Sequence, residues 1–181
     1  MHRNFWPGRT AVAVFGAAVA LTSVGTAWAQ SDPSTDTIKV TASFAAAANG
    51  KPARLYVTAN VENGWHIYSM TQPKGGPLPS KIKLTASDQY KLAGDFKASP
   101  KAELHNEPEV WPDVDIETHE GKVTWYVPIE FAPGTDPSKL TIEGKLNVQA
   151  CNSRGCLPPK DYKFTAAVGQ PVELKEEATE K

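Results

Sequence analysis

Residues 123–131 read VTWYVPIEF, and this stretch decides the fold. Apolar side chains stand at every second position, Val123, Trp125, Val127, Ile129 and Phe131, with Thr, Tyr, Pro and Glu between them. Side chains of an extended strand alternate between its two faces, so this pattern predicts a strand with one buried face. No segment of the mature chain carries an apolar stripe at the helical period of 3.6. Similar alternation recurs in residues 38–44, 54–61, 82–84, 140–150 and 162–168.

Turn-forming residues separate these runs. They are Asn49-Gly50, Asn63-Gly64, Gly75-Gly76-Pro77, Glu120-Gly121 and Pro133-Gly134. Short, half-buried strands with frequent turns are typical of an all-β antiparallel sandwich, which we predict here. The segment from Lys97 to Glu120 is acidic, punctuated by proline and weakly patterned, so we expect it to form a long irregular loop.

The first 29 residues have the pattern of a secretory signal peptide. Arg3 and Arg9 precede the apolar run of residues 11–21, and the small-x-small sequence Ala27-Trp28-Ala29 follows. An apolar run of eleven residues is too short for a bilayer, which needs about 20. We therefore predict cleavage after Ala29 and export to the periplasm. The expected divisions are residues 1–29, a flexible segment 30–37, one β-domain over 38–169, and a charged, disordered tail 170–181.

Composition excludes several classes of protein. The 181 residues carry 19 Lys+Arg and 20 Asp+Glu, and removal of Arg3 and Arg9 leaves 17 against 20, a net charge of −3. Such a chain lacks the basic surface expected of a nucleic-acid-binding protein. Two cysteines are too few for a four-thiolate zinc site. No later segment is apolar enough to enter a membrane, and an exported chain is free to form disulfides.

The two cysteines lie close together in the segment CNSRGC, residues 151–156. A Gly and polar residues between them predict the tip of a β-hairpin, which brings two Cβ atoms to the roughly 4 Å that a disulfide needs. A six-residue loop gives a structural bridge only about 2 kcal/mol, against about 3 kcal/mol for fifteen residues. The spacing leaves redox exchange and structural bridging equally open. Arg154 would favour a thiolate electrostatically.

Several motifs together resemble the N-terminal periplasmic domain of the thiol:disulfide interchange protein DsbD. Residues 148–159 read VQACNSRGCLPP, with Cys151 and Cys156 followed by two prolines. Residues 63–68, NGWHIY, match the Gly-aromatic-x-x-Tyr strand of that family, and residues 75–79, GGPLP, precede the expected strand at 82–84. The resemblance covers residues 38–169. The gap between the cysteines is one residue shorter than the commonest gap in the family.

The resemblance implies an immunoglobulin-like sandwich with a redox-active cysteine pair on a hairpin. Cys151 and Cys156 would exchange disulfides with thioredoxin-like or other redox proteins, with Cys156 attacking downstream substrate, and His66 and Tyr68 would flank them. The family's cap loop would correspond to Glu103, Leu104, His105 and Asn106, and an insertion with Trp111 and Pro112 follows. These 181 residues have no counterpart of the family's membrane and thioredoxin-like domains, so we expect a separate reductant.

Other functions remain open at this point. The domain could be a non-catalytic, immunoglobulin-like interaction module whose Cys151–Cys156 bridge is structural. Copper binding by the two cysteines and a histidine is a third hypothesis. His105 and His119 lie among acidic residues, but their spacing matches no metal site, and we expect neither a metal nor another cofactor. The segment from Lys97 to Glu120 is either a lid over the cysteines or an ordinary excursion. We expect a monomer.

Overall fold

The structure is a computed structural model that describes residues 36–48 and 50–175. The predicted signal peptide and residues 176–181 of the tail lie outside these residues. No helix in the described part of the chain is long and apolar enough to cross a membrane. The regular elements are β1 (Ile38–Ala45), β2 (Arg54–Val61), β3 (His66–Tyr68), β4 (Lys81–Leu84), β5 (Tyr90–Leu92), β6 (Lys97–Ser99), β7 (Glu103–Asn106), β8 (Asp115–Glu120), β9 (Lys122–Phe131), β10 (Ile142–Val148), β11 (Ala150–Asn152), β12 (Gly155–Cys156) and β13 (Lys160–Val168).

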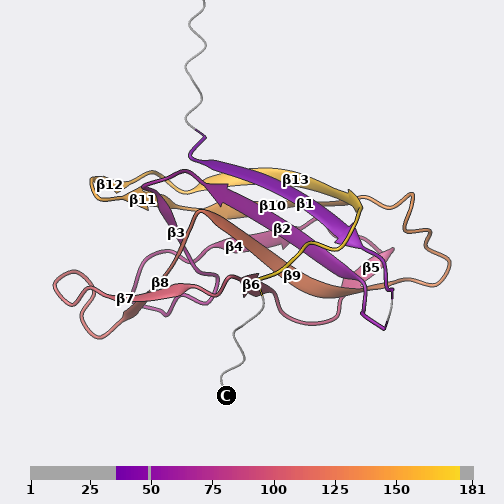
Figure 1. Cartoon of the computed structure of the whole chain (residues 1–181), viewed down its shortest axis with the longest axis horizontal. Coiled ribbons are helices and arrows are strands. Elements are labelled where there is room, and N and C mark those ends of the chain that lie inside the picture. Colours follow the sequence, from indigo (N-terminus) through magenta and orange to yellow (C-terminus); the bar gives the residue numbers. More distant parts are fainter. Residues whose placement is uncertain (1–35, 49, 176–181) are drawn as a thin grey trace, which may run out of the picture. The chain divides into compact units, whose positions relative to one another are not determined.

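These strands form a larger and a smaller sheet. The larger sheet has the order β4-β10-β13-β1-β2-β9-β5, and β6 also pairs with β9. The smaller sheet has the order β12-β11-β3-β8-β7 and carries both cysteines. All described pairs are antiparallel except β1 with β13. Figure 1 shows β11 and β12 at one end of the domain and β5 at the other.

Strand β9 is the strand that the alternating stretch of residues 123–131 predicted. It pairs with β2 from Arg54 opposite Pro128 to Asn60 opposite Lys122. Its inward side chains Val123, Trp125, Val127 and Ile129 are at most 2% exposed, and Phe131 at the end of the strand is partly buried. The prediction of a strand over this stretch is confirmed.

The larger sheet encloses a core between its two halves. One apolar cluster combines residues of β10 and β13 with residues of β1, β2 and β9, so the two halves face each other. Gly144 of β10 is needed there, because a Cβ would lie 2.7 Å from Phe164 Cζ and 2.9 Å from Leu84 Cδ2. A second cluster joins Ile67 and Ala150 of the smaller sheet to β9 and β10. The fold is the predicted all-β, immunoglobulin-like sandwich.

Two segments differ in detail from the sequence expectation. The run 140–150 is not one strand, because Val148 pairs with Lys160 in the larger sheet whereas Ala150 pairs with Ile67 in the smaller one. The chain thus changes sheets at Gln149. The segment expected as a long irregular loop contains β6, β7 and β8. Only residues 100–102 and 107–114 within it carry no strand. All residues of β7 are exposed, so its sequence lacks the alternation that marks a half-buried strand.

Both expected tails make contacts with the domain. Thr37 is buried, and its carbonyl accepts a hydrogen bond from Glu62 N. At the other end, the hydroxyl of Ser99 donates to the carbonyl of Lys175 at 3.0 Å. The ends of the predicted segments 30–37 and 170–181 are therefore attached to the β-domain where the structure describes them.

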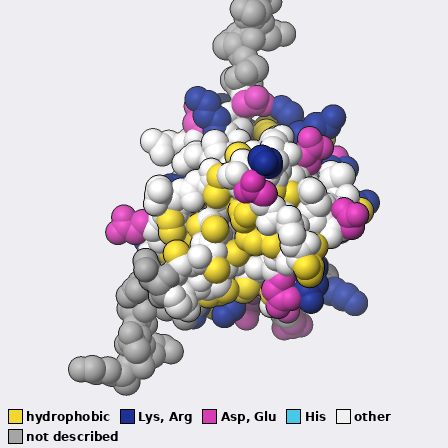
Figure 2. Space-filling view, turned by 90° about the vertical axis from the view of Figure 1, so that its right-hand side faces the viewer, with side chains coloured by type: hydrophobic (Ala, Val, Ile, Leu, Met, Phe, Trp, Pro, Cys, Tyr) yellow, Lys and Arg dark blue, Asp and Glu magenta, His cyan; other side chains and the backbone are white. Residues whose placement is uncertain are grey.

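The end of the domain near β5 exposes apolar side chains among charged ones (Figure 2). Leu92 of β5 is 40% exposed and Val168, the last residue of β13, is 42% exposed. This end lies away from β11 and β12 (Figure 1). It is therefore separate from the cysteine pair.

Candidate functional site

Cys151 and Cys156 form a disulfide at the tip of a β-hairpin, as the spacing predicted. The sulfur atoms are 2.05 Å apart and the Cα atoms 4.0 Å apart, and the two residues are opposite each other on β11 and β12. In the turn, Arg154 N donates to Asn152 Oδ1 at 2.8 Å. Gly155 has a φ of 146°, which favours glycine.

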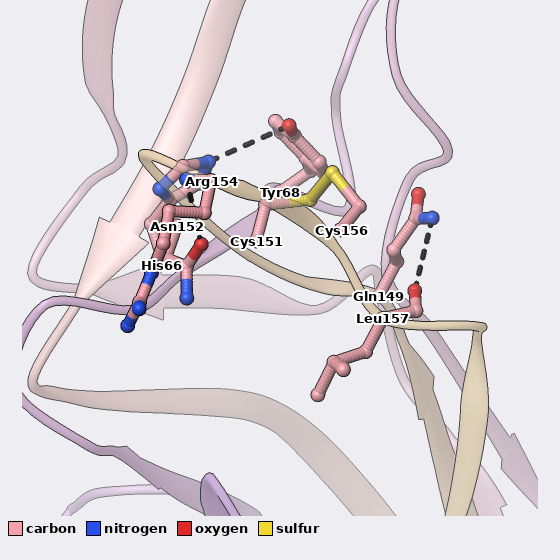
Figure 3. The surroundings of a disulfide bond; sticks show 8 residues. All are labelled: His66, Tyr68, Gln149, Cys151, Asn152, Arg154, Cys156 and Leu157. Atoms are coloured by element: carbon pink, nitrogen blue, oxygen red, sulfur yellow. Dashed lines mark hydrogen bonds between the residues drawn. A yellow bond between two sulfur atoms is a disulfide. The ribbon is translucent and has the colours of Figure 1, made fainter.

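Two further hydrogen bonds hold the base of the hairpin. Leu157 N donates to the carbonyl of Ala150 at 2.9 Å. Gln149 Nε2 donates to the carbonyl of Leu157 at 3.1 Å, as Figure 3 shows. The residue at which the chain changes sheets therefore also binds the segment just after Cys156. The position of Cys156 relative to Cys151 is fixed from both sides of the bridge.

The two cysteines differ in their exposure to solvent. Cys151 is 2% exposed because β11 lies inside the smaller sheet, between β12 and β3. Cys156 is exposed because β12 is the edge strand of that sheet. An attacking thiolate must approach a disulfide sulfur directly, so the exposed residue offers the accessible one.

Cys151 belongs to a small cluster that is separate from the two main cores. Its buried members are Cys151, Tyr68 and Ile116, and Trp111 and Val114 pack against them. Ala150 instead faces the second core cluster. Successive residues of a strand point to opposite faces, so Cys151 points away from the main core.

A row of side chains crosses the smaller sheet on the face that carries the disulfide. Cys156 is opposite Cys151, Cys151 is opposite His66, and His66 is opposite Glu120. Side chains at directly opposite positions of neighbouring strands share a face and lie close together. The row therefore runs over β12, β11, β3 and β8 and places a histidine and a carboxylate beside the disulfide.

His66 and Tyr68 also lie beside each other on this face. His66 Nε2 and the Tyr68 hydroxyl are 3.4 Å apart, and the rings meet edge to face with centroids 5.4 Å apart (Figure 3). Burial lowers the pKa of His66 below its ordinary value of 6.5, although the negative charges of Glu120 and Glu107 oppose that shift. Burial, aided by Glu107, raises the pKa of Tyr68. A histidine neutral at pH 7 is able to accept a proton.

The residues predicted as a cap loop form strand β7. This strand is separated from β11 by β8 and β3, and Leu104 is 69% exposed. The following stretch, residues 107–114, supplies the side chains that reach the cysteine cluster, Trp111 and Val114. A turn shapes this stretch, since Trp111 N donates to the carbonyl of Glu107 at 2.7 Å. The aromatic residue over the cluster therefore comes from the insertion that follows the predicted cap.

The side chain of Gln72 holds the end of this loop. Its Nε2 donates to the carbonyl of Asp115 at 3.0 Å, and its Oε1 accepts from Glu117 N at 2.7 Å. The amide thereby pairs with β8 as a neighbouring strand would, at a point where β3 has ended. Gly76 lies against the same loop, because a Cβ there would be 3.1 Å from Val114 Cγ1.

The remaining predicted residues lie outside the cluster. Arg154 is an exposed residue of the hairpin turn. His105 is on the exposed strand β7. His119 is buried on the face of the smaller sheet opposite to the disulfide, and its ring meets the ring of Trp125 edge to face. Among the residues that the structure describes, no group of three or more His, Cys, Asp or Glu side chains is placed to hold a metal ion.

Five residues of this site were not identified from the sequence as its members. They are Gln72, Trp111, Val114, Ile116 and Glu120. The alternation of Val114, Ile116, Thr118 and Glu120 is a signal for one face of a strand. The alternation does not predict that this strand pairs with β3. That pairing places these side chains on the same face of the sheet as the disulfide.

Comparison with known proteins assigns the chain to a family. A family model described as "Thiol:disulfide interchange protein DsbD, N-terminal" matches residues 34–167. The search of curated proteins found no match.

Two solved structures are similar in part. One is the N-terminal periplasmic domain of ScsB from Proteus mirabilis, with 17% identity and a TM-score of 0.47 over 74% of this chain. The other is AggA, the major subunit of aggregative adherence fimbriae type I from Escherichia coli, with 10% identity and a TM-score of 0.32. That match covers 74% of this chain and 93% of the AggA chain. The present chain spans 47% of the ScsB chain. The assignment rests on the family model, which covers most of the sequence: this chain belongs to the family of DsbD N-terminal domains.

Proposed function

We propose that this chain is an exported carrier of reducing equivalents that exchanges disulfides with protein partners through Cys151 and Cys156. The observation that carries the proposal is the unequal exposure of the two bonded cysteines, together with family membership. One sulfur is presented at a sheet edge, and the other is retained beneath a loop. A bridge that served only as a local staple would need no such difference.

The exchange starts at Cys156. A partner thiolate attacks Sγ of Cys156, the Cys151–Cys156 bond breaks, and Cys151 leaves as a thiolate. A second thiolate of the partner then attacks the partner sulfur of the mixed disulfide and releases Cys156 as a thiolate. The partner becomes a disulfide and this chain a dithiol, so two electrons have passed. The reverse sequence, begun by the Cys156 thiolate, reduces a target disulfide.

The loop of residues 107–114 acts in this proposal as the cap. Trp111 and Val114 pack against the cluster that contains Cys151, and this supports a shielding role. A partner that docks would displace the loop and reach the bridge. Residues 1–29 serve as the export signal, which places the exchange in the periplasm, and thioredoxin-like proteins are the expected partners.

A redox titration and a trapping experiment test the proposal together. The bridge is equilibrated with glutathione buffers, and a potential more oxidising than about −300 mV is expected, since structural bridges lie below that value. The Cys151→Ala variant is first converted at Cys156 to a mixed disulfide with 5-thio-2-nitrobenzoate. The thiolate of a thioredoxin that lacks its resolving cysteine should then attack Sγ of Cys156, release thionitrobenzoate and form a mixed disulfide between the two proteins. The Cys156→Ala variant is the matched control and should trap little. A native bridge that resists dithiothreitol, or a Cys151→Ala variant that traps nothing, would support the alternative of a structural bridge.

A further inference from the structure

The row that crosses the smaller sheet contains a carboxylate beyond His66. Glu120 is the last residue of β8, and it is directly opposite His66, which is directly opposite Cys151. Neighbouring strands are about 4.8 Å apart. The backbone of Glu120 is therefore one strand spacing from that of His66 and two spacings, about 10 Å, from that of Cys151. Coulomb attraction falls with distance, and Glu120 therefore acts about twice as strongly on His66 as on Cys151.

We propose that Glu120 and His66 form an acid–base pair for the exchange, in which His66 takes the thiol proton of Cys151 and Glu120 is the positioning residue that stabilises the resulting imidazolium. This inference rests on the proposed exchange at Cys151 and Cys156. The two residues are set in place by backbone pairing of β11, β3 and β8 and not by a flexible loop. The side chain of His66 is half-buried, whereas Glu120 is exposed.

The pair acts in the step that re-forms the bridge. Cys151 transfers its thiol proton to the neutral imidazole of His66 and becomes a thiolate. This thiolate attacks Sγ of Cys156, the Cys151–Cys156 bond forms, and the bond from Cys156 to the target sulfur breaks. The target sulfur leaves as a thiolate and takes a proton, so the target disulfide is reduced and the chain is oxidised. In the reverse direction the imidazolium returns the proton to the leaving Cys151.

Other charged groups near His66 also affect its protonation. Glu107 of the loop after β7 also favours the imidazolium, and His105 of β7 opposes it. The Tyr68 hydroxyl is 3.4 Å from Nε2 and orients the ring. Glu120 is the carboxylate in direct cross-strand register with His66, whereas Glu107 belongs to the loop that would move when a partner docks.

The thiol pKa of Cys151 tests the pair directly. It is measured from the thiolate absorbance at 240 nm in a Cys156→Ala background, where Cys151 is the single thiol. The His66→Asn change should raise this pKa by about one unit, which means tenfold less thiolate at a given pH below it. Glu120→Gln should raise it by about 0.3–0.5 units. Glu130→Gln on β9 removes the same charge far from the row and should leave it unchanged.

A double-variant cycle separates an effect through His66 from direct electrostatics. In a His66→Asn background, Glu120→Gln should no longer raise the Cys151 pKa, and it should lower it slightly, because only the repulsion between Glu120 and the thiolate is then removed. Glu120→Asp should restore most of the original pKa. Equal upward shifts in both backgrounds, or no shift on Glu120→Gln, would overturn the inference.

The outcome is distinguishable from failure of the proposed function. Far-ultraviolet circular dichroism confirms that each variant is folded, and Glu120 is exposed, so its substitution removes no core contact. If the unmodified chain exchanges with glutathione and the Glu120→Gln variant shows the same pH dependence of exchange, the acid–base pair is refuted and the proposed exchange is retained. If the native bridge does not exchange at all, the proposed function fails first.

Discussion

Cys151 and Cys156 are directly opposite each other on β11 and β12 with Cα atoms 4.0 Å apart, yet Cys151 is 2% exposed and Cys156 lies at the surface. The difference arises from their places in the smaller sheet, one inside it and one at its edge. The two sulfurs of one bond are thereby given different access to a partner.

The first prediction concerns the reduced protein. Iodoacetamide should label Cys156 at least tenfold faster than Cys151, because alkylation requires an approach to the sulfur that burial denies to Cys151. Mass spectrometry of the peptides after brief labelling gives both rates in one sample. Denaturation in urea is the control and should bring the two rates together. Equal labelling of the native chain would contradict the proposed division of roles.

The second prediction concerns Trp111, which packs against Tyr68, Ile116 and Cys151. Trp111→Ala should speed reduction of the bridge by dithiothreitol several-fold, because the cluster that covers Cys151 loses its largest side chain. The free energy of unfolding should fall by about 1–2 kcal/mol, as expected for a partly buried residue. Val110→Ala, next to it and 64% exposed, is the matched control and should change neither quantity. Unchanged reduction kinetics in Trp111→Ala would argue against a cap.

The third prediction uses the close packing at Gly76. An added Cβ would lie 2.7 Å from Gln72 Nε2 and 3.1 Å from Val114 Cγ1, so Gly76→Ala should push the loop off the cluster. We expect faster reduction of the bridge and a loss of about 1 kcal/mol in the free energy of unfolding.

Gly94→Ala is the control for this change. Its Cβ would be 3.8 Å from Pro128 Cδ, an ordinary contact, and alanine there should leave stability unchanged or slightly higher. Equal behaviour of the two alanine variants in urea denaturation would show that Gly76 does not position the loop.

The fourth prediction concerns the pH dependence of stability and rests on His119. Burial lowers the pKa of His119 from 6.5 to about 4, against the opposing charges of Glu117 and Glu103, and both ring nitrogens lack a hydrogen-bond partner. The unfolded chain therefore binds a proton that the folded chain resists between pH 6.5 and 4. The contribution of neutral His119 is complete above pH 6.5 and is lost as pH falls toward 4, by about 3 kcal/mol in total.

Urea denaturation at several pH values measures this effect. His119→Phe keeps an aromatic ring against Trp125 and removes the titrating group, so its free energy of unfolding should vary less between pH 6.5 and 4. His105→Phe, on the exposed strand β7, is the comparison and should retain the slope of the unmodified chain. A slope unaffected by His119→Phe would contradict the assignment.

Local patterns in the sequence were enough for the strands of the main core and for the hairpin. The alternation over residues 123–131 predicted β9, and the spacing of Cys151 and Cys156 predicted the opposed pair. These features depend on side-chain period and on turn residues, which act over a few positions. Strand β7 escaped prediction because none of its residues is buried, so its pairing with β8 leaves no apolar pattern.

The chain by itself determined an all-β sandwich with two cysteines placed to bond at a hairpin tip, because backbone alternation and short loop closure are local properties. Only the tertiary structure decided which cysteine is buried, that Trp111 packs against its cluster, and that Glu120 is directly opposite His66. Those relationships join β3, β8 and β11, strands that are far apart in sequence. Their pairing is set by burial of the whole sheet against the core, which no single segment of the sequence encodes.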